Sequence, residues 1–318
     1  MSVAVLGEAL IDLIIGEDGA YRPHLGGSPY NVAIGLARQG IPVSYLSSLS
    51  DDRFGEELCE SLLSEGVVVP SQRRSLCPTS LALVTVNDQG QPSYRLYREG
   101  IADKDTSLEE IIEHLPSDLR VFHTGSLAIT PSQLPKINAL FELMRERGIF
   151  ISIDINIRLR GSLDKKKYLD GVRSLMAVAN VVKASDEDIE AFELDGTIRE
   201  AAVQLHEEME DGLLVLTEGG GGAVLYGAPG GADAIEKRAY AVAKLEDTVG
   251  AGDTFHSAFL ASLYRTGAFE SSEVPSNAET LAEALDLACA AAAINVSRTG
   301  CSPPTRSELS SFIEASRR

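Results

Sequence analysis

Residues 121–154 read VFHTGSLAITPSQLPKINALFELMRERGIFISID, and this stretch decides the fold. Two short apolar runs, Val121–His123 and Ile149–Ile153, flank Gln133–Arg147, in which apolar residues recur at helical spacing. A strand, a helix and a second strand in this order form a βαβ unit, whose two strands are parallel. The stretch therefore predicts a parallel sheet that is covered by helices.

The same alternation continues in both directions along the chain. Further strands are predicted at Val3–Leu6, Val43–Leu46, Val181–Lys183 and Leu213–Thr217. Further helices are predicted at Tyr30–Arg38, Phe54–Leu63, Tyr168–Ala177, Gly250–Gly267, Asn277–Arg298 and Thr305–Ala315. The strands are apolar on both faces, as in a sheet with helices on both sides. We expect a single α/β domain over residues 1–318, with three layers and a mostly parallel central sheet.

Two segments do not follow this alternation of strands and helices. Ile11–Leu25 continues past the first strand without a helix. Thr79–Arg98 has the pattern of a hairpin, with strands Ser80–Val86 and Ser93–Tyr97 and a turn at Asn87-Asp88-Gln89-Gly90. We expect the two segments, about 11–25 and 79–98, to form a small sheet that acts as a lid over a site.

The composition excludes several classes of protein. With 44% hydrophobic residues the chain has enough apolar material for a core. A net charge of −19 makes general binding to nucleic acid or to an anionic membrane surface unfavourable. The first apolar run contains Glu8 and Asp12 and follows no basic segment, so it is typical of a strand and not of a signal peptide. The four cysteines are spread widely, which suits a reducing, cytoplasmic compartment.

The strongest local motif is Asp247-Thr248-Val249-Gly250-Ala251-Gly252-Asp253-Thr254-Phe255, which opens a predicted helix. Gly250 and Gly252 allow the backbone to approach a ligand closely, and the free N–H groups of a helix start favour an anion. A carboxylate in that turn, Asp253, could take a proton from an attacking hydroxyl in phosphoryl transfer. The alternative from these residues alone is a tight turn in which Asp253 caps the helix.

A second motif, Leu25-Gly26-Gly27-Ser28-Pro29-Tyr30-Asn31, opens the helix Tyr30–Arg38. Gly26 and Gly27 leave room for a ligand, and Asn31 can both donate and accept hydrogen bonds, which suits a sugar hydroxyl. An ordinary strand-to-helix turn explains the same residues.

Polar residues follow several predicted strands, at the sheet edge where ligands of open parallel sheets bind. They are Asp12, Asp154-Ile155-Asn156-Ile157-Arg158 and Thr217-Glu218-Gly219-Gly220-Gly221-Gly222. Strand ends are often polar for solubility alone, and four glycines can simply form a flexible turn. The sequence contains no P-loop, no H-E-x-x-H, no G-x-S-x-G and no G-x-G-x-x-G after its first strand.

Together the two glycine motifs resemble those of the ribokinase-like (PfkB-type) carbohydrate kinase family, over nearly the whole chain. The resemblance implies a ribokinase-like fold, with a mostly parallel sheet and a small β lid. It also implies transfer of the γ-phosphoryl group of ATP to a sugar hydroxyl with Mg²⁺, and a small-molecule sugar and ATP as the partners. A homodimer is compatible with the resemblance, and the sequence does not determine the oligomeric state.

The resemblance also assigns roles to residues. Asp253 is the expected catalytic base, with Gly250, Ala251 and Gly252 as the anion hole. The expected sugar-binding residues are Asp12, Gly26, Gly27, Asn31, Arg98, Asn156 and Arg158. The expected nucleotide-binding residues are Thr217, Gly219, Gly222 and Asn295, the last of them beside the adenine. Asp247 and Val249, with the loop Ser297–Ser302, match the region where many members hold a monovalent cation such as K⁺.

Two positions depart from the family pattern. Many members carry an Asn-x-x-Glu motif that organises Mg²⁺, whereas this chain has Ser185 and Asp188 there. The resemblance leaves Asp188 a contact with Mg²⁺ through water. Glu218 occupies a position that is usually apolar.

The segments Ser28–Asn31, Tyr97–Asp103 and Asp154–Arg158 resemble the fructokinase branch. Kinases of 2-keto-3-deoxygluconate are close relatives that use arginines to meet a carboxylate, so Arg98 and Arg158 suit either substrate. A hypothesis of another class is a non-catalytic protein on the same fold that binds sugar or nucleotide, since fold alone does not decide function. Retention of Asp253 argues against it.

Overall fold

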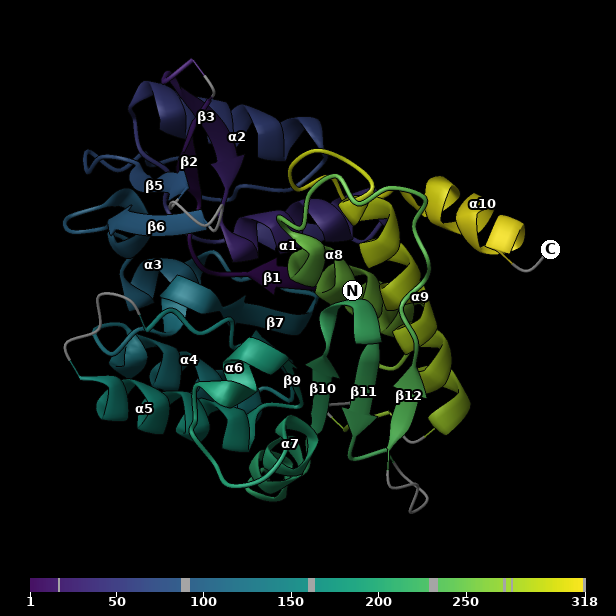
Figure 1. The fold of residues 1–318 in the computed structure, drawn as a ribbon. Coiled ribbons are helices and arrows are strands. Elements are labelled where there is room, and N and C mark those ends of the chain that lie inside the picture. The colour runs from purple at the N-terminus through teal and green to yellow at the C-terminus, as the bar shows by residue number, and fades with distance from the viewer. Residues whose placement is uncertain are drawn as a thin grey trace.

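The computed structural model describes residues 1–16, 18–86, 92–159, 164–228, 234–270, 273–275 and 277–316. Within these residues the main sheet has eight strands in the order β12-β11-β10-β9-β8-β7-β1-β4 (Figure 1). In chain order they are β1 (Ser2–Val5), β4 (Val43–Tyr45), β7 (Leu119–Gly125), β8 (Phe150–Asp154), β9 (Val181–Ser185), β10 (Leu213–Thr217), β11 (Ala223–Tyr226) and β12 (Ile235–Lys237). Neighbouring strands pair in parallel along the sheet through β4, β1, β7, β8, β9 and β10. At the other end β11 and β12 are added in antiparallel pairing. The predicted mostly parallel sheet is confirmed.

Helices cover both faces of this sheet. One face carries α1 (Ser28–Arg38), α2 (Arg53–Ser64), α8 (Ala251–Arg265) and α9 (Ala278–Val296), with α10 (Arg306–Ser316) packed on α9. The other face carries α3 (Leu108–Glu113), α4 (Leu134–Glu146), α5 (Lys165–Val178), α6 (Asp186–Glu190) and α7 (Ile198–Glu207). Successive residues of β1 show why both faces are apolar, because Val3 and Val5 enter one core and Ala4 enters the other.

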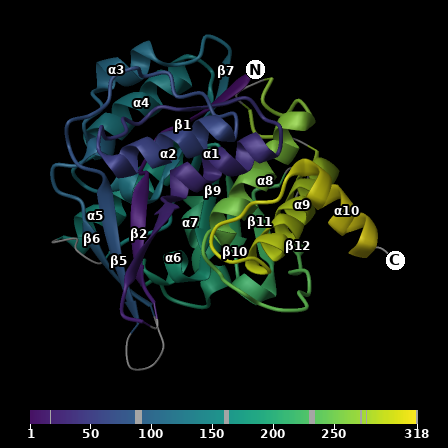
Figure 2. The same ribbon diagram turned by 90° about the horizontal axis from the view of Figure 1, so that it is seen from above.

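A second sheet of four strands, in the order β3-β2-β5-β6, stands beside the main body (Figure 2). Its strands are β2 (Leu10–Ile15), β3 (Tyr21–Gly26), β5 (Ser80–Val86) and β6 (Pro92–Tyr97). β2 pairs antiparallel with β3 and parallel with β5, and β5 pairs antiparallel with β6. The separate small sheet predicted from these two segments is confirmed, while its predicted turn at 87–90 lies outside the described residues.

The carboxyl ends of the central strands bring polar residues together. The pairing of β8 with β9 sets Asp154 opposite Lys183, and that of β9 with β10 sets Ser185 opposite Thr217. Ligands of open α/β sheets bind beyond this edge. None of the helices in the described part of the chain combines the length and the apolar character that a membrane span requires.

Candidate active site

The helix α8 begins at a glycine that no other residue could replace without strain. Gly250 has φ +70°, and a Cβ atom on it would lie 2.2 Å from the Cys301 sulfur. No side chain caps the first turn of α8. Backbone N–H groups near the start of this helix are therefore available to an anion, which the helix dipole also favours.

The Asp253 carboxylate lies in that first turn and is held from α1. The Ser28 hydroxyl donates to Asp253 Oδ1 over 2.6 Å, and the Asn31 amide donates to Oδ2 over 2.8 Å. Asp253 is 7% exposed, and it does not cap its own helix. The two glycine motifs of the sequence thus meet at one carboxylate.

The ionisation of Asp253 is shifted towards neutral pH. Burial raises its pKa to about 6, and the nearby charge of Asp154 adds to the rise. The hydrogen bonds from Ser28 and Asn31 and the charge of Lys183 act in the opposite direction. A carboxylate with this pKa is mostly ionised at pH 7 and can still accept a proton during a reaction, as a general base must.

The start of α1 is shaped by two glycines. Gly27 has φ +115°, and a Cβ atom there would lie 2.4 Å from the Glu8 carbonyl oxygen. A Cβ atom on Gly26 would lie 2.6 Å from Asp12 Oδ2. The glycines therefore let β2 and α1 approach closely, and they keep the Asp12 carboxylate near the site.

Asp12 in β2 is influenced by the charge of Arg158, which lies in the segment after β8. Burial raises the pKa of Asp12 to about 6; the positive charge of Arg158 opposes the rise, and the Asp253 charge adds to it. Asn156, which follows β8, has φ +35°, a conformation that asparagine accepts more readily than most residues. Asp12, Arg158 and Asp253 thus share one electrostatic environment.

Arg98 is held at the base of the small sheet. Its guanidinium forms an ion pair with Asp103 over 2.8 Å and donates to the Ser80 hydroxyl over 3.0 Å. Both partners of the ion pair are nearly buried. Its positive charge also counteracts the effect of burial on Glu8, whose pKa is raised to about 7. A sugar-binding role for Arg98 stays a prediction.

The predicted nucleotide turn connects β10 with β11. Thr217 ends β10, and Gly219–Gly221 form a short 3-10 helix with open space around Gly219 and Gly220. Gly222 has φ +103°, and a Cβ atom there would lie 2.1 Å from the Lys237 carbonyl oxygen. Glu218, the unusual residue of this turn, pairs with Arg199 at the start of α7 over 2.7 Å.

Asn295 is fully buried, and its amide is engaged inside the protein. It donates to the Val249 carbonyl over 2.9 Å and accepts from Ser302 N–H over 2.7 Å and from the Thr254 hydroxyl over 3.1 Å. These bonds join the loop before α8 to the loop after α9. The expected contact of Asn295 with adenine stays a prediction, since its polar atoms already hold these two loops.

Asp247 is organised by backbone groups of the same two loops. Its Oδ1 accepts from Val249 N–H over 3.0 Å, and its Oδ2 accepts from Gly300 N–H over 2.9 Å. The Val249 carbonyl keeps a second lone pair beyond its bond with Asn295. Oxygen atoms of this kind suit a hard cation.

Asp188 closes a capping box with Ser185 at the start of α6. Its Oδ2 accepts from the Ser185 N–H and hydroxyl, both over 2.8 Å, and its Oδ1 accepts from Ile157 N–H over 2.6 Å. A carboxylate accepts about four hydrogen bonds, so one position remains for a water molecule of a hydrated ion. Among the residues that the structure describes, no three His, Cys, Asp or Glu side chains form a metal-binding group.

Three residues of the site lie in segments that the sequence singles out but had no individual role predicted for them. Ser28 lies inside the first glycine motif, and its hydroxyl binds Asp253. Asp154 and Lys183 form a buried ion pair whose Nζ atom lies 3.0 Å from each carboxylate oxygen. The signal for this pair was the position of both residues at the ends of adjacent predicted strands.

Comparison with known proteins agrees with this geometry. The sequence model described as pfkB family carbohydrate kinase matches residues 1–308. A fructokinase of Rhizobium leguminosarum bv. trifolii is 33% identical over 265 residues, which cover 81% of this chain and 78% of that protein.

Two solved structures are similar over nearly their full lengths. A fructokinase from Xylella fastidiosa with bound ATP has a TM-score of 0.86 and 26% identity, covering 100% of this chain and 99% of the other. A fructokinase from Vibrio cholerae O395 in fructose-, ADP- and calcium-bound form has a TM-score of 0.82 and 25% identity, covering 98% and 99%. The fold, the two glycine motifs that meet at Asp253 and the match over residues 1–308 lead to one conclusion: the chain belongs to the pfkB family of carbohydrate kinases.

Proposed function

We propose that this kinase transfers the γ-phosphoryl group of ATP to a primary hydroxyl of fructose. The observation that carries the proposal is the buried Asp253 carboxylate in the uncapped first turn of α8, held by Ser28 and Asn31. A protein that only bound sugar or nucleotide would have no use for a carboxylate held in this way. The fructokinase relatives and the fructokinase structures support fructose as the acceptor.

In this reaction Asp253 takes the proton of the attacking sugar hydroxyl. The hydroxyl oxygen forms a bond to the γ-phosphorus, the bond between that phosphorus and the bridging oxygen breaks, and ADP leaves with the electron pair. The backbone around Gly250, Ala251 and Gly252 binds the transferring phosphoryl group and stabilises its charge. Asp12, Gly26, Gly27, Asn31, Asn156 and Arg158 surround the sugar.

On the nucleotide side, Thr217, Gly219 and Gly222 shape the turn against which ATP lies. Asp188, whose internal bonds leave one acceptor position free, would hold Mg²⁺ through water, and the ion would supply neutralisation of phosphate charge. The Asp247 carboxylate and the Val249 carbonyl fit a monovalent cation such as K⁺ beside the anion site.

The state of Arg98 favours a neutral sugar over a sugar acid. A sugar acid needs an arginine free to form a forked pair with its carboxylate. Arg98 is already paired with the buried Asp103 through a single contact of 2.8 Å between Nη2 and Oδ2. Displacing it would leave a buried negative charge without its partner, which is costly.

The function is tested by measuring ATP consumption across a panel of sugars that contains fructose, glucose, ribose and 2-keto-3-deoxygluconate. We expect fructose to have the highest kcat/KM and the product to carry phosphate on a primary carbon, seen by NMR. A turnover about 10²–10⁴-fold lower in an Asp253→Asn variant purified in the same way excludes a contaminating kinase. A much higher kcat/KM for 2-keto-3-deoxygluconate would contradict the fructose assignment and leave the kinase assignment intact.

We propose further that the small sheet, residues 11–25 and 79–98, is a lid that closes over the sugar. Its outer strand β3 is exposed from Tyr21 to His24, whereas Ile11 of β2 belongs to the main core and Leu10 and Ala82 form a small cluster with Leu127. An exposed outer strand has few buried contacts and opens more easily without ligand than the strands of the main sheet. Closure would keep water from competing with the sugar for the phosphoryl group.

Hydrogen exchange measures this closure. Saturating fructose with a non-hydrolysable ATP analogue should slow exchange in β2 and β5 more than in β8 of the main sheet. Equal rates with and without ligand in β2 and β5 would make the small sheet a fixed structural element.

The four cysteines, Cys59, Cys77, Cys289 and Cys301, are all free thiols. Free thiols together with the sugar and ATP substrates support a cytoplasmic location.

A further inference from the structure

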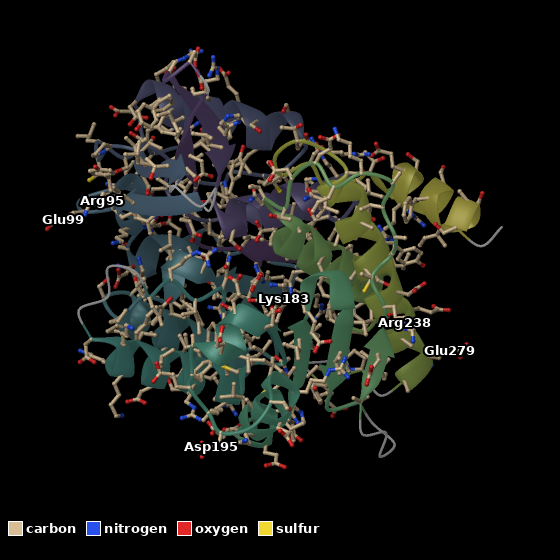
Figure 3. The ribbon with its side chains drawn as sticks, in the orientation of Figure 1. Arg95, Glu99, Lys183, Asp195, Arg238 and Glu279 are labelled. Atoms are coloured by element: carbon tan, nitrogen blue, oxygen red, sulfur yellow. The ribbon has the colours of Figure 1, made fainter. Side chains whose placement is uncertain are left out.

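A buried lysine lies against the uncapped start of α8. Lys183 is at the end of β9, is 4% exposed, and forms two bonds of 3.0 Å with the Asp154 carboxylate at the end of β8. Figure 3 shows Lys183 in the middle of the molecule, whereas Asp195 and Glu279 lie at its periphery. A Cβ atom on Gly252 would lie 3.1 Å from Lys183 Nζ, so the ammonium group directly contacts the anion-hole turn.

Two positive groups meet at this turn. The N-terminus of a helix carries a partial positive charge, and Lys183 adds a full one beside it. Burial alone would lower the pKa of Lys183, but the charges of Asp154, Asp188 and Asp253 raise it above its usual value. The lysine therefore stays charged. An anion bound between the Lys183 ammonium group and the N-terminus of α8 would be stabilised by both.

We propose that Asp154 and Lys183 are a positioning pair for phosphoryl transfer: Lys183 holds a positive charge against the first turn of α8, keeps the Asp253 carboxylate ionised and makes the turn receptive to phosphate. The pair acts through Asp253 and the backbone of α8. The inference deepens the proposed function and rests on it.

The two members of the pair act on Asp253 in opposite directions. Asp154 is a neighbouring negative charge, which favours the protonated form of Asp253, and Lys183 is a positive charge, which favours the ionised form. Removing either residue therefore shifts the ionisation of Asp253 by a predictable sign. A pair with only a structural role would weaken the fold in both variants without opposite shifts.

The other groups that face Asp253 or act on it are Asp12 from β2, Ser28 and Asn31 from α1, and Cys301 from the loop after α9. His256 of α8 instead contacts Ser152 and is influenced by Lys183. Burial raises the pKa of the Cys301 thiol, and burial lowers the pKa of His256 to about 3, so both are neutral near pH 6. Asp12 and Glu8 titrate in the same range, but Arg158 and Arg98 are the cations that act on them. A shift that follows changes at 154 and 183 therefore reports Asp253, together with Asp12 to the extent that the charge of Asp253 acts on it.

The test is the pH dependence of kcat/KM, measured with the sugar that wild type phosphorylates best. Wild-type activity should fall as the pH drops through about 6. Lys183→Met should move this acidic limb to higher pH, and Asp154→Asn should move it to lower pH, each by about one pH unit. Lys183→Arg, which keeps the charge, should leave the limb near its wild-type position.

Two further variants complete the design. Lys183→Met leaves Asp154 buried and unpaired, which can prevent folding. The double variant Asp154→Asn with Lys183→Met carries no buried charge at either position, and its limb should return towards that of wild type. Lys166→Met removes the lysine of the exposed pair Lys166–Asp170 and should shift nothing.

The outcomes separate the two proposals. If wild type prefers a sugar other than fructose, the fructose assignment fails, and the variants are measured with that sugar. If wild type is active and the limb of Asp154→Asn coincides with that of wild type, the positioning role of the pair is overturned. Limbs that move in the same direction for Asp154→Asn and Lys183→Met would overturn it as well.

Discussion

The starts of α1 and α8 both follow a glycine, and they differ in the groups that they present to a ligand. Each follows a glycine with positive φ, Gly27 or Gly250, and neither has a capping side chain. In α1, however, the N–H of Ser28 already donates to Glu8 Oε1 over 3.3 Å, and Pro29 has no N–H. The start of α1 therefore presents side chains, whereas the start of α8 presents its backbone.

The difference matches two kinds of ligand. A start that presents hydroxyl and amide side chains suits a carboxylate and a neutral sugar, and one that presents N–H groups suits a phosphoryl group. The helix α9 provides the reference, because the Asn277 side chain accepts from the N–H groups of Glu279 and Thr280 and so occupies its first turn. A side-chain cap stabilises a helix and also blocks the site that an anion would use.

The largest expected effect comes from the residue that both starts share. Asp253→Asn should lower kcat about 10²–10⁴-fold, because the amide cannot accept the proton of the sugar hydroxyl. ATP and sugar binding should be largely retained, which isothermal titration calorimetry measures. Asp195→Asn, which changes an exposed aspartate, is the matched control. A kcat near that of wild type in Asp253→Asn would remove this carboxylate from the mechanism.

The smallest expected effect is at the capped start. Asn277→Ala should lower the free energy of unfolding by about 1 kcal/mol, measured by urea denaturation, because the first turn of α9 loses its acceptor. The value of kcat should not change. A tenfold loss of kcat in this variant would show that the cap of α9 affects catalysis. It would contradict the division between a capped start that serves stability and an uncapped start that binds an anion.

Most of the fold could be predicted, because long periodic segments and buried apolar runs carry strong signals. The six predicted strands of the main sheet and the small sheet are all present. The edge strands β11 and β12 were not predicted, since they are short and follow glycine-rich segments that resemble loops. The helices α3, α6 and α7 were also missed, although each begins with a capping box that is visible in the sequence.

Only part of the candidate active site could be predicted from the sequence, and the reason is physical. Glycines and a carboxylate within one turn form a local motif that can be recognised by its spacing, so Gly250, Gly252 and Asp253 could be predicted. Asp154 and Lys183 are 29 residues apart along the chain and meet only through the register of β8 with β9. No local pattern encodes that register, and a lysine at a strand end normally faces water.

The hydrogen bonds from α1 to Asp253 also determine when the site can form during synthesis of the chain. Asn31 and Asp253 are separated by 222 residues. At a synthesis rate of 5–20 residues per second, the first glycine motif leaves the ribosome on the order of ten to forty seconds before its partner. Contacts this distant also slow folding, because a long loop must close before they form. The nascent kinase thus spends most of its own synthesis without a reactive centre, and catalysis begins only with the last fifth of the chain.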